Sequence, residues 1–279
     1  MNKEIQTTNS SVSIYEDPYN KRIRVDDYDG AVDEVLVIIS RMISGWVEKL
    51  IVKSRTKDLA FFLAHGFLEE AQVKGYFSGE GMHFVVKYYS DERKLSKKWN
   101  EEQVIFENLK NLNEGLEPKE LVYIQFASPV DSVDLAQLYA ESFQVYPTPV
   151  SDPHYIEKTM DEGTIYAYIK EHGNIMSAAS AEINRKYKNA ELTDCATQKH
   201  AQGKGHMKKL MVALEEKLVG DGIKCLYTLA RAESIGMNKA FFQLGYTYGG
   251  RLVNNCNIYS GIEDMNVWWK RGRIVKWES

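Results

Sequence analysis

The stretch from Ala190 to Leu218 changes its periodicity once, and this change constrains the fold more than any other feature of the chain. Up to Thr197, polar and apolar side chains alternate, which is typical of a strand with two different faces. After a turn rich in glycine and lysine, apolar residues recur at helical spacing and predict one buried stripe. They are Met207, Leu210, Met211, Leu214 and Leu218. The stretch therefore predicts a strand, a glycine turn and a helix.

The turn between this strand and helix has the composition of an anion-binding site. Gly203 and Gly205 allow an anion to approach the backbone closely. The first amides of the following helix have no partner within the helix, and its dipole favours negative charge there. Lys204 and Lys208 add positive charge. An ordinary strand–turn–helix unit with solvated lysines explains the turn equally well, because a short Gly-x-Gly is a weak signal.

Residues 202–207, Gln-Gly-Lys-Gly-His-Met, resemble the acetyl-CoA signature of the GNAT N-acetyltransferases, although Met207 stands where Gly or Ala is usual. Residues 238–246 resemble the helix that follows in that family. The resemblance covers roughly residues 121–270. It implies an α/β (α+β) GNAT fold, a mixed twisted sheet flanked by helices, whose fourth and fifth strands diverge to admit the pantetheine arm. It also implies acetyl-CoA as co-substrate and no metal.

The same resemblance implies which residues surround the cofactor. They lie on the strand, on the turn and on the two following helices: Cys195, Ala196, Thr197, Gln202, Gly203, Lys204, Gly205, His206, Met207, Lys208, Asn238 and Phe241.

A narrower resemblance rests on residues 190–197, 228–232, 244–250 and 263–268, which look like the β-lysine N6-acetyltransferases. It implies β-lysine as the amine substrate and Nε-acetyl-β-lysine, a compatible solute, as the product. It also implies a functional link to lysine 2,3-aminomutase. Two alternatives remain open: acetylation of another amine (lysine, a polyamine or a protein lysine), or a non-catalytic acyl-CoA-binding module.

Acetyl transfer to an amine requires a base, because the ammonium has a pKa of about 10.4 in solution. Glu191 is the first candidate, since its strand resembles that of the histone acetyltransferase branch, whose glutamate is the base. Glu182 on the neighbouring strand is the second. Asp194 is the third, although it faces away from Glu191 unless a bulge turns it. For each, a structural salt bridge is an equal alternative.

The general acid is harder to predict. The family often uses a tyrosine where this chain has Phe241, which cannot donate a proton. Either Tyr246, Tyr248 or Tyr259 replaces it, or the thiolate leaves unassisted.

A free amino-acid substrate must be held by its charges. Arg231 closes the strand after the cofactor helix, where its fork could bind a carboxylate at two points. Glu263 and Asp264 could pair with the second ammonium. Asn254 and Asn255 supply neutral donors and acceptors, or form a turn.

The first half of the chain looks like a partial repeat of the second, although chance similarity of amphipathic elements is an alternative. Residues 60–67 parallel residues 240–246, and each segment follows one strand and precedes two more. We predict an N-terminal GNAT-like domain lacking a cofactor turn (14–92), a helical connector (93–118) and a catalytic GNAT domain (119–271). The polar residues 1–13 are expected to be a frayed tail.

Composition bounds the partners and the compartment. The net charge of −4 gives no general attraction to nucleic acid. No apolar run approaches the roughly 18 residues of a membrane helix, and no signal-peptide core is visible. The 3 cysteines lack the paired spacing of a metal site. We therefore expect a soluble cytoplasmic protein without nucleic-acid or membrane partners, and a homodimer is left open.

Overall fold

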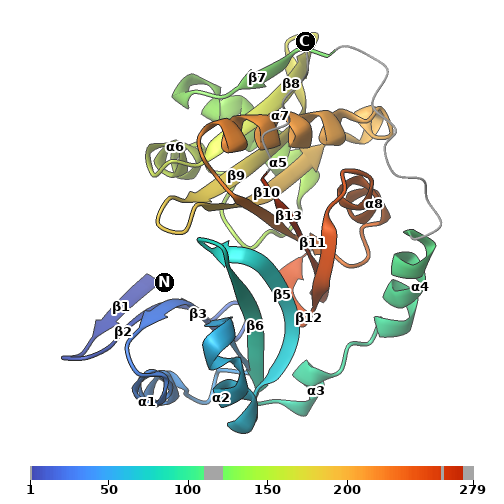
Figure 1. Ribbon diagram of the computed structural model, residues 1–279. Helices are drawn as coiled ribbons and strands as arrows, with labels where there is room; N and C mark the ends of the chain where they lie inside the picture. The colour runs from blue at the N-terminus through green and yellow to red at the C-terminus, as the bar shows by residue number, and fades with distance from the viewer. Residues whose placement is uncertain (1, 110–121, 259–260, 273–279) are drawn as a thin grey trace.

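The computed structural model describes residues 2–109, 122–258 and 261–272 (Figure 1). In this part of the chain, 13 strands form one mixed sheet in the order β1-β2-β3-β4-β6-β5-β12-β13-β11-β10-β9-β8-β7. The first half of the sequence supplies one end of this sheet and the second half supplies the other. Tyr259 and residues 110–118 of the predicted connector lie outside the described residues.

The first half alternates strands with two short helices. Its elements are β1 (Asn2–Gln6), β2 (Ser11–Asp17), β3 (Arg22–Asp29), α1 (Val32–Met42), β4 (Lys49–Arg55), η1 (Thr56–Asp58), α2 (Leu59–Ala64), β5 (Leu68–Phe77) and β6 (Glu80–Tyr88). Two connector helices follow, α3 (Asp91–Lys94) and α4 (Trp99–Leu109).

The second half carries the longest helix, α7. Its elements are β7 (Ile124–Phe126), η2 (Pro129–Asp131), α5 (Ser132–Ser142), α6 (Pro153–Asp161), β8 (Ile165–Glu171), β9 (Asn174–Asn184), β10 (Asn189–Thr197), η3 (Lys199–Ala201), α7 (His206–Gly220), β11 (Cys225–Arg231), α8 (Ile235–Gln243), β12 (Thr247–Ile258) and β13 (Gly261–Arg271). Ala190 and Leu192 of β10 pack against Leu210 and Leu214 of α7, so the predicted change of period is realised as one packed unit.

The two halves repeat one topology. The order β2-β3-β4-β6-β5 in the first half matches β9-β10-β11-β13-β12 in the second, and each contains one parallel pair, β3 with β4 and β10 with β11. The helices also correspond, α1 to α7 and α2 to α8. The halves join where β5 meets β12 in antiparallel pairing. This arrangement supports the predicted repeat, while the division into domains stays our proposal.

The junction of β5 and β12 depends on glycine because the two backbones touch. A Cβ on Gly250 would lie 2.2 Å from the carbonyl oxygen of Glu70, and one on Gly249 would lie 2.2 Å from that of Gln72. Such contacts are too short for any side chain. Substitution of either glycine would push the halves apart.

The first half differs from the second at the turn before its helix. Gly30 precedes α1 with φ +103°, and a Cβ there would lie 2.5 Å from the carbonyl oxygen of Asn9. A side chain at this position would therefore clash with the chain's own backbone. The absence of a cofactor turn in the first half stays a prediction.

The prediction of a frayed tail at residues 1–13 is wrong. β1 pairs with β2, and β2 pairs with β3, so backbone hydrogen bonds hold this segment. Val12 and Ile14 of β2 are buried in the core of the first half. The exposed faces of β1 and β2 make this segment polar in composition, so the sequence did not indicate strands here.

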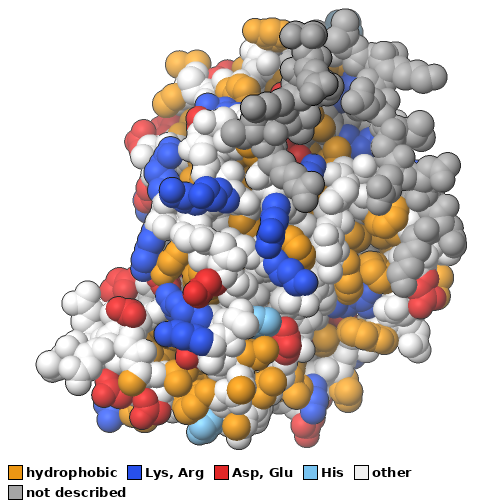
Figure 2. All heavy atoms as spheres, in the orientation of Figure 1, with side chains coloured by type: hydrophobic (Ala, Val, Ile, Leu, Met, Phe, Trp, Pro, Cys, Tyr) orange, Lys and Arg blue, Asp and Glu red, His pale blue; other side chains and the backbone are white. Residues whose placement is uncertain are grey.

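A hydrophobic layer joins the inner faces of the two halves. Ile51, Val73 and Phe84 of the first half pack with Tyr227 and Val267 of the second. Helices α7 and α8 lie on the other side of the second half's sheet, as Figure 1 shows. On the face seen in Figure 2, acidic and basic side chains are interspersed over both halves.

Candidate active site

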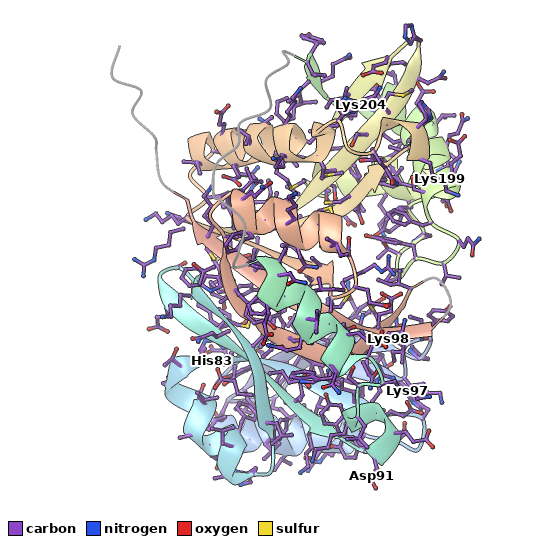
Figure 3. The ribbon with its side chains drawn as sticks, turned by 90° about the vertical axis from the view of Figure 1, so that its right-hand side faces the viewer. His83, Asp91, Lys97, Lys98, Lys199 and Lys204 are labelled. Atoms are coloured by element: carbon purple, nitrogen blue, oxygen red, sulfur yellow. The ribbon has the colours of Figure 1, made fainter. Side chains whose placement is uncertain are left out.

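The turn before α7 is shaped to receive an anion. Gly203 and Gly205 have φ values of +82° and +77°, in the left-handed region that favours glycine. Gly205 is the N-cap of α7 and offers no side-chain acceptor to the first amides of the helix. Space is open at the Cβ position of Gly203. In Figure 3, Lys199 and Lys204 lie beside this turn. The turn therefore fits the phosphates of a CoA ester.

Strands β10 and β11 diverge beside this turn. Their parallel pairing runs only from Asn189 opposite Cys225 to Glu191 opposite Tyr227. Beyond this point the second part of β10, which carries Cys195, Ala196 and Thr197, is not paired with β11. The divergence is the one that the sequence resemblance implied.

Three carboxylates gather on one face of the sheet at the point of divergence, and we call Glu182, Glu191 and Asp194 the acidic triplet. Glu191 lies directly opposite Glu182 in the β9–β10 pairing, so both side chains share a face. A bulge between Thr193 and Ala196 gives Asp194 a φ of +47°. Asp194 accepts a hydrogen bond from the Ser180 hydroxyl at 2.6 Å. The bulge thus turns Asp194 to the face of Glu191, which strand alternation alone would not do.

Like charges in the acidic triplet change how the carboxyls titrate. Solvent reaches the Glu182 side chain. Burial among protein atoms, with further contributions from Glu191 and Asp194, nevertheless raises the pKa of Glu182 to about 7. Burial also raises the pKa of Asp194, although hydrogen bonds from Ser180 and Tyr146 oppose the shift. A carboxyl that titrates near neutral pH is suited to accept a proton.

The raised pKa of Glu182 predicts a stability effect. The folded state disfavours the ionised carboxyl, so the stability that Glu182 contributes is full below its ordinary pKa of 4.5 and is lost as the pH rises through about 7. Glu182→Gln lacks this loss. We expect the difference in Tm between Glu182→Gln and the parent protein to become more positive from pH 5 to pH 8. A difference that does not change with pH would show that Glu182 titrates normally.

The first half of the chain places charged groups opposite the acidic triplet. The Arg24 Nε donates to Asp26 Oδ1 at 2.7 Å, and the Lys53 Nζ lies 2.8 Å from the same oxygen. Burial lowers the pKa of Arg24, but Asp26 and, further away, Glu191 outweigh it, so the pKa is raised. Lys53 also interacts electrostatically with Glu191. We call Arg24, Asp26 and Lys53 the inner charge cluster; sequence analysis did not identify it.

A cavity of about 570 Å³ lies between the halves and is lined by residues 15–19, Tyr139 and residues 143–151. One wall is the β2–β3 hairpin, which includes Tyr15, and the other is the α5–α6 connection around Tyr146. Tyr146 also hydrogen-bonds Asp194, so this wall contacts the acidic triplet. Arg24 lies over the Tyr15 ring, 5.2 Å from its centroid, so the opposite wall contacts the inner charge cluster.

Two of the predicted substrate residues pair with each other. Arg231 donates to Glu263 from Nε at 2.6 Å and from Nη2 at 2.8 Å. This is a two-point pair, and it occupies the side of the Arg231 fork that would bind a carboxylate. Substrate binding by either residue would require the pair to open. Their assignment to the substrate stays a prediction.

The remaining predicted substrate residues lie in a network with the connector. Asn254 donates from its side chain to the carbonyl oxygens of Arg93 and Leu95, both at 3.0 Å. Its backbone amide donates to Asp264 Oδ1 at 2.7 Å. Asn255 is buried beside it, and its carbonyl oxygen accepts from Arg93. These contacts hold α3 to β12 and do not bring the asparagines to the acidic triplet.

The predicted acid and two cofactor residues have well-defined surroundings. Tyr246 is buried edge-on against Phe241, and burial together with Glu215 raises its pKa well above the ordinary value. Tyr248 donates to Asn266 Oδ1 at 3.4 Å. The Asn238 side chain accepts from Asn266 and Trp268 and donates to nearby carbonyl oxygens. Asn238 therefore braces α8 against the sheet.

Among the described residues, no group of three or more His, Cys, Asp or Glu side chains is arranged to hold a metal ion. No helix in this part of the chain is long and apolar enough to cross a membrane.

Comparison with known proteins adds the following findings. Residues 133–246 match the Acetyltransferase (GNAT) family. The chain is 38% identical to N-acetyltransferase YodP of Bacillus subtilis over 97% of this chain and 100% of that protein. It is 37% identical to a β-lysine N(6)-acetyltransferase of Methanosarcina mazei over 73% and 83%, respectively. It is 31% identical to a β-lysine N(6)-acetyltransferase of Methanococcus maripaludis over 97% and 99%.

Proposed function

Because the chain belongs to the GNAT family and is an acetyl-CoA-dependent N-acetyltransferase, we propose that it acetylates the terminal (N6) amine of β-lysine. Two relatives at 37% and 31% identity carry that activity in their names. The observation that carries the proposal is the cavity between the halves, one wall of which contacts Asp194 of the acidic triplet through Tyr146 while the other contacts Arg24 through Tyr15. A diamino acid carries a carboxylate and ammonium groups, so its binding site needs groups of both charges.

The cofactor is expected at the turn before α7 and between the diverging strands. Bound acetyl-CoA supplies the activated acetyl thioester. Gly203 and Gly205 give the phosphates access to backbone amides, and Lys204 adds positive charge. The pantetheine arm would follow β10 past Cys195 towards the acidic triplet. With this placement the acetyl group and the amine meet at the point of divergence.

The acidic triplet is proposed to prepare the amine. Glu182 accepts a proton from the substrate ammonium, because its pKa of about 7 leaves about half of it ionised at neutral pH and able to bind a proton. Glu191 and Asp194 provide the negative charge that attracts the ammonium and raises the pKa of Glu182. Tyr246 remains the candidate acid, and departure of the thiolate without an acid is the alternative.

The biological role is part of the same proposal. Nε-Acetyl-β-lysine would serve as a compatible solute made in the cytoplasm. A lysine 2,3-aminomutase would supply β-lysine.

Substrate selectivity tests the proposal directly. A site that holds the carboxylate and the second amine reads the spacing between two charges, and leaving one buried charge unpaired costs more than losing a methylene. We expect kcat/KM for β-lysine to exceed that for α-lysine and for the matching diamine without a carboxylate by about 10-fold or more. The measurement is release of free CoA at fixed acetyl-CoA.

The other outcomes identify the alternatives. Equal kcat/KM for all three amines would replace the proposal with a general amine acetyltransferase. A higher kcat/KM for α-lysine would identify α-lysine as the preferred substrate instead of β-lysine. Acetyl-CoA binding without CoA release on any amine would indicate a non-catalytic acyl-CoA-binding module.

A further inference from the structure

We propose that Arg24, on β3 of the first half, binds the carboxylate of the amino-acid substrate, so that the substrate lies between the two halves. This inference rests on the proposed function, since it requires a substrate with a carboxylate. It gives the first half a direct part in substrate recognition. Sequence analysis assigned the carboxylate to Arg231 instead.

Arg231 and Arg24 differ in the hydrogen bonds that their guanidinium groups already make. Arg231 holds Glu263 at two points, 2.6 and 2.8 Å. Arg24 uses Nε for Asp26 at 2.7 Å. Among the described residues, no hydrogen bond is recorded for its two terminal nitrogens, and 33% of its side chain is exposed. A guanidinium with its terminal nitrogens available can bind a carboxylate at two points.

The surroundings of Arg24 hold the guanidinium in place. Arg24 is directly opposite Tyr15 in the β2–β3 pairing and lies over the ring of that tyrosine. Asp26 fixes the Nε end, and Lys53 at 2.8 Å shares the charge of Asp26. Asp26 is therefore neutralised by two cations, which leaves a net positive charge in the inner charge cluster. This positive charge faces Glu191 of the acidic triplet, and a substrate that brings both a carboxylate and an ammonium can lie between the two groups without a change in net charge.

The position of Arg24 relative to the acidic triplet sets the orientation of the substrate. Tyr15, beneath Arg24, lines the 570 Å³ cavity, and Tyr146 on the opposite wall hydrogen-bonds Asp194. Arg24 also interacts electrostatically with Glu191. A diamino acid would place its carboxylate on the Arg24 side and its reacting amine on the side of Glu182. The positive inner charge cluster and the negative acidic triplet, each in contact with a tyrosine of the cavity wall, favour a substrate that carries both charges.

The test compares substrates with and without the carboxylate. We expect Arg24→Gln to lower the ratio of kcat/KM for β-lysine to kcat/KM for the matching diamine by about 10- to 100-fold, mostly through KM. Arg24→Lys keeps the charge but not the fork and should give an intermediate loss. Calorimetry of β-lysine binding in the presence of free CoA should show the same order. Arg185→Gln, an exposed arginine on the β9–β10 connection, is the matched control and should leave the ratio unchanged.

The failures of the two proposals are distinguishable. If the parent protein prefers β-lysine and Arg24→Gln keeps that preference, this inference is overturned while the proposed function stands. If Arg231→Gln alone removes the preference, the carboxylate binds at Arg231. If the parent protein shows no preference for β-lysine over the diamine, both proposals fail. A normal circular dichroism spectrum for Arg24→Gln and Arg24→Lys shows that a loss comes from binding and not from misfolding.

Discussion

Glu182→Gln is expected to lower kcat at neutral pH by about 10²–10⁴-fold, the usual contribution of a general base. The amide cannot accept a proton from the substrate ammonium, although it has nearly the same size as the carboxyl. The acidic limb of the pH–rate profile, expected near pH 7 from the raised pKa of Glu182, should disappear with it. Affinity for CoA, measured by calorimetry, should change little because we place the phosphates at the turn before α7, away from Glu182.

Glu191→Gln separates the roles within the acidic triplet. Glu191 lies opposite Glu182, and removing its negative charge should lower the pKa of Glu182. The acidic limb of the pH–rate profile should therefore move to lower pH, while turnover is partly kept. Glu216→Gln, on the exposed side of α7, controls for the loss of one carboxylate. If Glu191→Gln abolishes turnover and Glu182→Gln does not, Glu191 is the base, as the sequence resemblance suggested. If Asp194→Asn is the only inactive variant, Asp194 is the general base.

Gly203→Asp is expected to weaken CoA binding on the order of 100-fold, because a carboxylate would stand a few ångströms from the phosphates. Gly203 has φ +82° and open space at its Cβ position, so a side chain fits without a clash. Aspartate and asparagine tolerate this left-handed conformation better than most residues. The measurement is the Kd of CoA by calorimetry.

Gly203→Asn is the matched control, since it has the same shape without the charge. It should weaken binding by about tenfold or less, and the difference between the two variants isolates repulsion of the phosphates. Gly222→Asp, at the other end of α7 with φ +86°, carries the same change away from the turn and should leave Kd unchanged. Equal effects of Gly203→Asp and Gly203→Asn would place the phosphates elsewhere.

Local patterns predicted the parts of the fold that depend on neighbours in sequence. The change of period between β10 and α7 was readable because one strand and one helix each bury a single face. The repeat of the two halves was readable because the same amphipathic elements recur in the same order. The strands before residue 14 were missed, since the pairing of β1 with β2 and of β2 with β3 brings together segments whose composition is mostly polar.

The candidate site was predicted less completely because it depends on contacts between distant residues. Strand alternation alone puts Asp194 on the face away from Glu191. The bulge that turns it to the same face leaves no clear pattern in a sequence. Arg24 alternates with the buried Ile23 and Val25, which reads as an ordinary exposed face. Only the packing of the first half against β10 and β11 turns that face inward. The pairing of Arg231 with Glu263 likewise joins two strands far apart in sequence.

The junction of β5 and β12 makes this chain the single-chain counterpart of a symmetric dimer. Corresponding edge strands of two copies meet antiparallel, as they would about a two-fold axis. Because the two halves are covalently joined, they are always present in equal number. Pairing between two identical halves does not compete with pairing between the two different ones. Each copy can then specialise. In our proposal, the second half keeps the turn that binds phosphates, and the first half, in which a Cβ on Gly30 would lie 2.5 Å from the carbonyl oxygen of Asn9, contributes its inner face to substrate binding.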